Sequence, residues 1–176
     1  MNLSVVVFVY VNERGVRCMD EYIAVYGKRL YGLCVTLCAS QYDADDLYQE
    51  TWLRAFSRFS TYDTSMPFEP WITRICVNIF RDVLRRRKRE RICDADDNYD
   101  ISESVSDSRQ EDMRHIRDAV DRLPEKLRTA VILFYFHDMS EKQTAEALGI
   151  PVGTVKSRLS KAKKLLREEL GDAEFI

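Results

Sequence analysis

The chain has 176 residues, with 27 lysines and arginines against 29 aspartates and glutamates, for a formal net charge of −2. Hydrophobic residues make up 45% of it and charged residues 32%. This balance excludes a long disordered or collagen-like chain. With only 6 glycines and 4 prolines, the composition favours helices over a turn-rich β protein, in one domain or two small ones.

The near-zero net charge hides three strongly charged segments. Residues 74–91 hold eight basic and two acidic residues, and residues 152–167 hold six basic residues and no acid. Between them, residues 94–112 hold eight acids and one arginine. The average charge thus conceals two basic segments separated by an acidic connector, and this pattern says more about the chain than its net charge does.

The first eighteen residues differ in character from the rest of the chain. Leu3–Val11 is apolar and β-branched, but it is too short to span a bilayer and lacks the basic start and cleavage site of a secretory signal. A clear helical pattern begins at Met19. We therefore expect Met19 to be the native start and residues 1–18 to be a non-native or disordered extension. Mass spectrometry of the natively expressed protein tests this, and a terminus at Met1 would refute it.

Three amphipathic segments come next. Residues 20–39 carry apolar side chains at helical spacing, Asp43 is expected to cap a helix that runs to Phe59, and residues 68–91 form a third helix after a loop over residues 61–67. Leu53 is assigned to the apolar side of the second helix. Three such helices can close a small core. Residues 92–110 are acidic, serine-rich and poor in large apolar groups, which predicts a flexible linker.

The last part of the chain predicts a helix-turn-helix. Ser140-Glu-Lys-Gln143 has the form of a capping box, Gly149 suits a left-handed helix end, and a basic helix runs from Pro151 to Leu170. Its apolar residues are expected to face the core and its polar residues a DNA major groove. A solvated basic helix is the plain alternative. The expected groove-facing residues are Thr154, Lys156, Ser157, Arg158, Ser160, Lys161 and Lys164.

Two further clusters carry candidate chemistry. Basic residues from Arg81 to Arg91 follow aromatic residues such as Trp71, a combination typical of single-strand binding. The plain alternatives are a core position for Trp71 and stabilisation of a helix C-terminus by residues 85–89. Carboxylates from Asp43 to Glu50 begin the second helix beside Trp52, which looks exposed. They indicate either ordinary helix-start acids or a protein-docking surface. A magnesium-dependent enzyme ranks far lower, because no nucleophile or ligand histidine accompanies them.

The five cysteines are expected to be small buried thiols in a reducing cytosol. Cys34 and Cys38 are spaced to share a metal, but no second ligand pair lies near them, so we expect no metal site and no cofactor. The remaining cysteines are Cys18, Cys76 and Cys93.

Three motifs, taken in their order along the chain, resemble those of the small extracytoplasmic-function group of bacterial sigma factors. Asp43–Phe56 is similar to that family's core-polymerase-binding motif, Pro70–Arg86 to its promoter-melting helix, and Gly149–Leu159 to its minus-thirty-five recognition helix. The resemblance covers about residues 19–170. It implies an all-α fold of two small helical domains joined by a flexible acidic linker, the second domain a helix-turn-helix. The implied division is an extension over residues 1–18, sigma domain two over 19–91, the linker over 92–110 and sigma domain four over 111–176.

The resemblance also implies roles for individual residues. Asp45, Asp46, Gln49, Glu50 and Trp52 would bind core polymerase. Trp71, Asn78, Asp82, Arg85 and Arg86 would lie nearest a melted non-template strand. The groove-facing residues of the last helix would read the upstream duplex element.

The function implied is that of a promoter-specificity subunit, not an enzyme. Its partners would be core RNA polymerase, promoter DNA and an anti-sigma factor, and it would act in the cytoplasm, at times held at the inner membrane by that inhibitor. An autonomous helix-turn-helix regulator is the competing interpretation. That alternative leaves the acidic helix and the Trp71–Arg86 helix unexplained.

Overall fold

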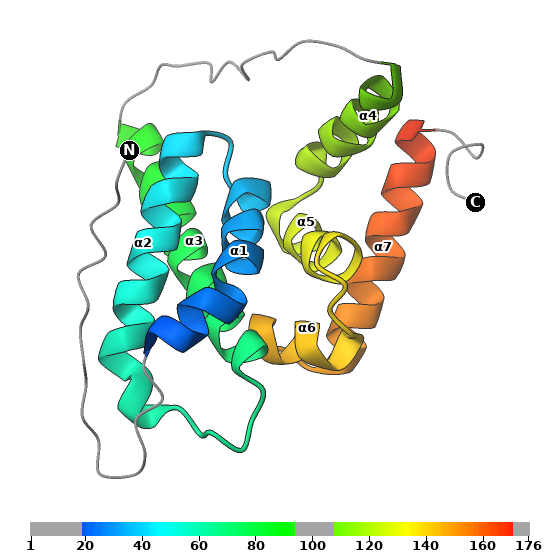
Figure 1. Ribbon diagram of the computed structural model, residues 1–176. Coiled ribbons are helices and arrows are strands. Elements are labelled where there is room, and N and C mark those ends of the chain that lie inside the picture. The colour runs from blue at the N-terminus through cyan, green and yellow to red at the C-terminus, as the bar shows by residue number, and fades with distance from the viewer. Residues whose placement is uncertain (1–18, 94–107, 171–176) are drawn as a thin grey trace.

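The computed structural model describes residues 19–93 and 108–170, and within these ranges it contains helices and no strand. The all-α expectation is therefore confirmed. The elements form an N-terminal group, α1 to α3, and a C-terminal group, α4 to α7 (Figure 1). Their bounds are α1 Met19–Leu37, α2 Gln41–Arg58, η1 Phe59–Thr61, α3 Phe68–Cys93, α4 Ser108–Arg122, α5 Glu125–Val131, η2 Ile132–Phe136, α6 Glu141–Leu148 and α7 Val152–Leu170.

The N-terminal group buries the apolar stripes of three helices. Leu33 and Cys34 of α1, Ala55 of α2 and Val77 of α3 are all almost fully buried. A dense aromatic cluster closes the lower end of this core, where the Phe68 ring lies 4.3 Å from Tyr22 and 5.3 Å from Trp71 between ring centroids. Removing these side chains from water supplies most of the driving force for packing.

Helix α2 begins earlier than the sequence pattern indicates. Ser40 is its N-cap, because the Ser40 hydroxyl accepts a hydrogen bond from the backbone N–H of Asp43 at 3.1 Å. The expectation that Asp43 caps this helix is therefore wrong. Its carboxylate instead accepts a hydrogen bond from Arg87 of α3, and this guanidinium is the main reason that the pKa of Asp43 is lowered.

The segment between the two groups is bounded by longer helices than expected. α3 continues to Cys93 and α4 begins at Ser108, so both helices extend into the range 92–110 assigned to the linker. Residues 94–107, like the extension 1–18, lie outside the described residues.

The C-terminal group contains the expected helix-turn-helix. Ser140 and Gln143 form a complete capping box, with bonds of 3.2 Å and 2.9 Å, and Gly149 ends α6 at φ 63°, where a side chain would be strained. Val155, Leu159, Ala162 and Leu166 of α7 are buried, as their spacing predicts. Upstream, α5 continues into η2, a wider π turn that ends with the bond from His137 N–H to the Ile132 carbonyl.

The two groups pack against each other rather than standing apart. α6 lies beside the first half of α3, and η2 contacts α1 (Figure 1). As a result α3 is buried on two sides between residues 72 and 80, where only Arg74 and Asn78 are exposed. None of the described helices is long and apolar enough to cross a membrane.

Candidate polymerase and promoter interfaces

The exposed face of α2 carries one stripe of residues, which we call the α2 face. Tyr42, Asp46, Gln49 and Leu53 follow at intervals of four, three and four residues, so they lie above one another on the helix. Tyr42 is 74% and Leu53 65% exposed. Two large apolar side chains held in water between polar ones are typical of a surface that another protein covers.

The five residues expected to bind polymerase divide into three kinds. Asp46 and Gln49 are exposed on the α2 face. Asp45 accepts a hydrogen bond from the Tyr31 hydroxyl at 2.8 Å, and Glu50 pairs with Arg54 at 2.7 Å, so both are partly engaged within the N-terminal group. Trp52 is only 8% exposed and stacks with Phe68, so the expectation that it is exposed is wrong.

Sequence reasoning missed Tyr42 and assigned Leu53 to the core. The structure exposes both, because the buried side of α2 is formed by Ala44, Leu47, Thr51 and Ala55. The signal was present in the spacing: Leu53 falls in phase with Asp46 and Gln49, and only its apolar character suggested burial.

A second candidate surface runs along α3, and we call it the α3 stripe. Arg74, Asn78, Asp82, Arg85 and Arg89 are exposed at helical spacing, and Arg86 is exposed beside them. Asp82 and Arg85 form an ion pair of 3.1 Å that is open to solvent. Four of the five residues expected near a melted strand, Asn78, Asp82, Arg85 and Arg86, are thus brought together on the accessible side of α3.

The fifth residue, Trp71, lies in the aromatic cluster at the start of α3. Its ring is half-buried and packs 4.9 Å from the Tyr62 ring. The adjoining loop is fixed by its own bonds: Asp63 accepts hydrogen bonds from the backbone and hydroxyl of Ser65, and both lower its pKa. The Tyr62 hydroxyl also donates to the Met66 carbonyl. The loop is therefore an ordered, exposed edge beside the α3 stripe.

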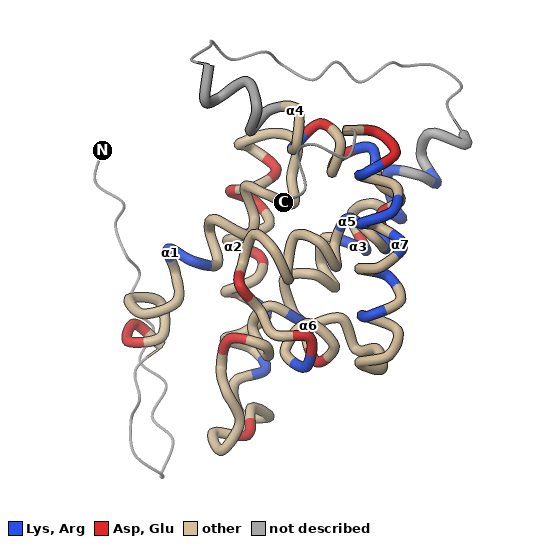
Figure 2. The backbone as a smooth tube through the Cα atoms, turned by 90° about the vertical axis from the view of Figure 1, so that its right-hand side faces the viewer, with Lys and Arg blue, Asp and Glu red and all other residues tan. Residues whose placement is uncertain are grey.

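The outward side of α7 forms the third surface, the α7 face, with lysines and arginines along most of its length (Figure 2). Lys156, Ser157, Ser160 and Lys161 are exposed, as expected of groove-facing residues. Thr154 and Arg158 are half-buried, and Arg158 Nη1 is buried without a hydrogen-bond partner. Lys156 also forms an ion pair of 3.4 Å with Glu141 of α6.

The cysteine that lies next to Cys34 is not Cys38, four residues further along the chain, but Cys76 of another helix. The Cys34 sulfur lies 3.8 Å from that of Cys76 on α3, and both thiols are fully buried. Burial raises the pKa of the Cys38 thiol to about 12, which keeps it protonated and a poor metal ligand. No group of three or more residues able to hold a metal is found in the ranges 19–93 and 108–170.

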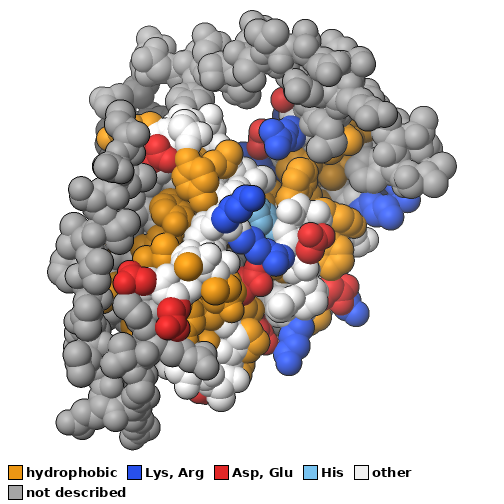
Figure 3. Space-filling view, in the orientation of Figure 1, with side chains coloured by type: hydrophobic (Ala, Val, Ile, Leu, Met, Phe, Trp, Pro, Cys, Tyr) orange, Lys and Arg blue, Asp and Glu red, His pale blue; other side chains and the backbone are white. Residues whose placement is uncertain are grey.

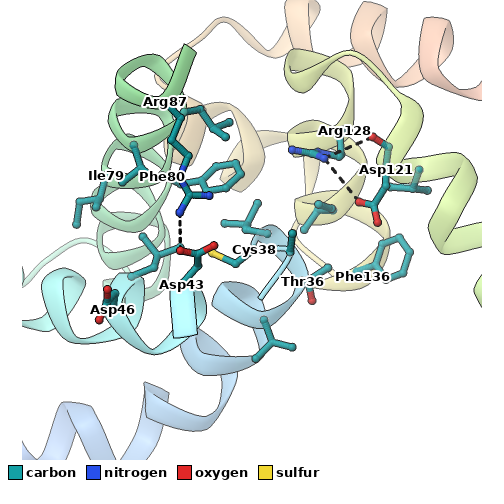
Figure 4. Close-up of a pocket in the computed structure, with 18 of the residues that line it drawn as sticks. Thr36, Cys38, Asp43, Asp46, Ile79, Phe80, Arg87, Asp121, Arg128 and Phe136 are labelled. Carbon is teal, nitrogen blue, oxygen red and sulfur yellow. Dashed lines mark hydrogen bonds and ion pairs between the residues drawn. The ribbon is translucent and has the colours of Figure 1, made fainter. Parts of the chain in front are cut away.

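A groove of about 620 Å³ lies between the two groups (Figure 4). One wall comes from the end of α1, the start of α2 and the second half of α3, including the Asp43–Arg87 pair. The opposite wall comes from α4, α5 and η2, where Arg128 and Asp121 lie 3.7 Å apart. Phe80 and Phe136 contribute apolar lining.

Comparison with known proteins agrees with this arrangement. Family models of Sigma-70 region 2 and Sigma-70 region 4 match residues 22–90 and 113–166. RNA polymerase sigma factor SigV of Bacillus subtilis is 32% identical over 140 residues, which cover 80% of this chain and 83% of SigV. The ECF RNA polymerase sigma factor SigE of Mycolicibacterium smegmatis is 34% identical over 158 residues, covering 86% of this chain and 61% of SigE.

Solved structures show the same fold. The sigma factor RpoE of Bartonella quintana, solved in complex with the anti-sigma factor NepR, has a TM-score of 0.75 at 25% identity and matches 88% of this chain and 98% of that one. CnrH, solved with the cytosolic domain of CnrY, has a TM-score of 0.67 at 21% identity, over 91% of this chain and 92% of that one.

A helical group with an acidic, partly apolar exposed face on α2, followed by a basic helix-turn-helix, together with the two family matches defines a sigma-70 class of protein. The ECF RNA polymerase sigma factor EcfG of Rhodopseudomonas palustris is 32% identical over 139 residues, covering 78% of this chain and 76% of EcfG. The chain therefore belongs to the ECF RNA polymerase sigma factors. It is thus a polymerase-binding sigma factor, and the autonomous regulator is not favoured.

Proposed function

We propose that the α2 face docks on core RNA polymerase, with Asp46 and Gln49 supplying polar contacts and Tyr42 and Leu53 the apolar ones. The support is their joint exposure on one helix side that no element of the described chain covers. Asp45 and Glu50 lie at its edge, where their present partners Tyr31 and Arg54 hold them in place. Trp52 supports the α2 face from the core side, because its ring stacks on Phe68 and so packs α2 against α3.

The α3 stripe and the loop over residues 61–67 bind the melted non-template strand. Arg85 and Arg86 are placed to contact phosphates. Trp71, which packs on Tyr62 of the loop, and the exposed Asn78 lie in the first half of α3, nearer the loop, where an unstacked base would fit. A site that accepts only an extruded base stabilises the open promoter by binding alone. Strand opening then requires neither catalysis nor a cofactor from this chain.

The α7 face reads the upstream duplex element in its major groove. The capped turn before α7 fixes the angle of this helix, and its exposed residues near the N-terminus are those that reach base edges in helix-turn-helix proteins. Lys161 and Lys164 lie further along, where they would contact phosphates.

The groove between the two groups is the proposed site of an inhibitory protein. Its walls combine apolar residues with ion pairs, a lining suited to an amphipathic segment. The support is that RpoE was solved with an anti-sigma factor. We place the chain in the cytoplasm, with an inhibitor that retains it at the inner membrane between signals.

The single observation that carries the proposed roles is the separation of three exposed surfaces on three different helices. The test measures binding of a promoter duplex by the purified chain alone and by the chain with core polymerase. The chemical reactivity of unpaired thymines in the same duplex then reports whether its strands have opened. We expect weak binding alone and specific open complexes with polymerase. Tight sequence-specific binding by the isolated chain would contradict the proposal.

Charge reversal tests the docking surface itself. Asp46→Arg should abolish polymerase binding while leaving the helical circular dichroism unchanged, because Asp46 is exposed. Glu21→Arg, at an exposed acid in the first turn of α1, is the matched control and should bind normally. Retained affinity in Asp46→Arg would show that polymerase binds elsewhere.

A further inference from the structure

Tyr31 of α1 reaches across to the start of α2 and meets the edge of the α2 face. Its hydroxyl donates a hydrogen bond to Asp45 Oδ1 at 2.8 Å. The Gln41 amide donates to the Tyr31 hydroxyl and, at 3.3 Å, to the same Asp45 oxygen. These three side chains form one network, which we call the Tyr31 network. Because Asp45 directly precedes Asp46, the network lies where the α2 face meets α1.

The direction of each hydrogen bond in the Tyr31 network follows from its chemistry. The amide nitrogen of Gln41 only donates, so the Tyr31 oxygen accepts from it and the single hydroxyl proton goes to Asp45. The hydrogen bond to Asp45 is also the main reason that the pKa of Tyr31 is raised. The hydroxyl therefore stays protonated at physiological pH and remains a donor to the carboxylate.

The Tyr31 network engages one of the two oxygens of Asp45. Both donors bind Oδ1, and a carboxylate has a second acceptor oxygen, Oδ2. A half-buried carboxylate that is held by two donors loses most of its rotational freedom before any partner arrives. A partner that donates to Oδ2 then has less side-chain ordering to supply, which favours binding.

The Tyr31 ring is itself held in place by packing. It meets the Tyr48 ring edge to face at 5.4 Å between centroids, and Tyr48 packs at 6.3 Å on the buried Trp52. Gly27 of α1 leaves room for Tyr48, since an added Cβ would lie 2.9 Å from the Tyr48 hydroxyl. The hydroxyl that binds Asp45 is thus carried by a ring fixed between two helices.

The surroundings of the network make the direction of a single carboxylate important. Val25 and Val35 of α1 are exposed, and hydrophobic side chains are grouped over the N-terminal helices on the face in Figure 3. On α2, Tyr42 and Leu53 are exposed as well. When a partner covers apolar surface, a misdirected acceptor leaves a donor of the partner without a hydrogen bond, and this costs affinity.

We propose that Tyr31 is a positioning residue for polymerase binding: together with Gln41 it holds Asp45 so that Oδ2 accepts a hydrogen bond from a donor of core polymerase. Asp45 is then a direct contact, and Tyr31 acts through it without touching polymerase. This inference rests on the proposed function, in which the α2 face docks on that enzyme.

The test is a double-mutant cycle measured as the Kd of the full chain for core polymerase. Tyr31→Phe keeps the ring and removes only the hydroxyl, and it should raise the Kd about three- to tenfold because Asp45 loses a donor. In an Asp45→Ala background, the same substitution should leave the Kd unchanged. Tyr26→Phe is the matched control on α1, since the Tyr26 ring packs on Phe68 at 5.0 Å, and it should bind as the wild type does.

Three outcomes would overturn the positioning role. The first is a Kd of Tyr31→Phe equal to that of Tyr26→Phe, and this comparison decides alone if Asp45→Ala loses helical circular dichroism. The second is an equal loss with and without the Asp45 carboxylate, because a merely structural effect of the hydroxyl does not depend on Asp45. The third is normal binding by Asp45→Ala.

The third outcome also separates this inference from the proposed function. If Asp45→Ala binds normally while Asp46→Arg abolishes binding, the docking surface stands and the role of Tyr31 fails. If both variants bind normally, the docking surface itself is refuted.

Discussion

Individual side chains decide which surfaces are available, and Arg158 is the clearest case. It lies on the recognition helix but is half-buried, with one nitrogen lacking a partner. We predict that Arg158→Ala in the holoenzyme relaxes specificity at one base pair of the upstream element, at about 1–3 kcal/mol for a lost bidentate contact. Lys164→Ala is the control, expected to weaken all sequences alike. If Arg158→Ala weakened binding to all promoter sequences equally, Arg158 would be a phosphate contact.

His137 predicts a pH dependence of stability. Burial lowers its pKa, and Arg29 lowers it further, whereas Asp138 opposes this. Because the unfolded chain binds the proton more readily than the folded one, the contribution of His137 is present above the unfolded pKa, about 6.5, and is lost as the pH falls below it.

The test measures urea midpoints at pH 7.5 and pH 5.5 for the wild type and for His137→Gln. The glutamine variant should lose less stability on acidification than the wild type, since it has no proton to bind. A loss of the same size in both proteins would show that His137 does not cause the pH dependence.

At the scale of elements, capping fixes the helix-turn-helix. The Ser140 hydroxyl and the Gln143 side chain each satisfy a free backbone donor at the start of α6. Ser140→Ala should therefore destabilise the chain by about 1 kcal/mol, measured by chemical denaturation. Ser160→Ala, at an exposed position within α7, should change stability much less. An unchanged midpoint for Ser140→Ala would show that tertiary packing alone holds α6.

Element boundaries also show where sequence patterns fall short. The helices over residues 20–39, 68–91 and 151–170 were predictable because apolar side chains recur at helical spacing. The end of α3 at Cys93 and the start of α4 at Ser108 were not predicted. Ser108, Arg109 and Gln110 extend α4 without an apolar signal, and Ile92 and Cys93 stand directly before an acidic stretch that indicated a linker. Ser40 caps α2, whereas the Asp43 carboxylate lies inside the first turn and accepts a hydrogen bond from Arg87 of α3, a long-range contact that no local pattern indicates.

At the scale of the whole molecule, the buried residues of both groups form one continuous core cluster. Both tryptophans, Trp52 and Trp71, lie in the N-terminal group, whereas helical circular dichroism reports both groups. We predict that thermal unfolding followed by the two signals coincides in the wild type.

The variant that combines Arg29→Ala with Arg81→Ala supplies the comparison. In this double variant the tryptophan and circular-dichroism transitions should separate, because the loss of the Arg29 and Arg81 contacts with the His137 and Leu148 carbonyls weakens the packing between the groups. Separate transitions already in the wild type would show that the packing between the groups is too weak to couple their unfolding. The division into domains at residues 92–110 stays a prediction.

The all-α class, the helix-turn-helix, and the exposure of Asn78, Asp82, Arg85 and Arg86 on α3 and of Lys156, Ser157, Ser160 and Lys161 on α7 could be predicted from the sequence, because helical spacing, caps and clustered charge are local properties. Only the tertiary structure decided the burial of Trp52, the exposure of Leu53 and the contact of Arg81 with Leu148. These depend on which neighbour covers a given helix side. Local spacing defines the sides of a helix, but contacts between residues far apart in the chain determine which side meets water.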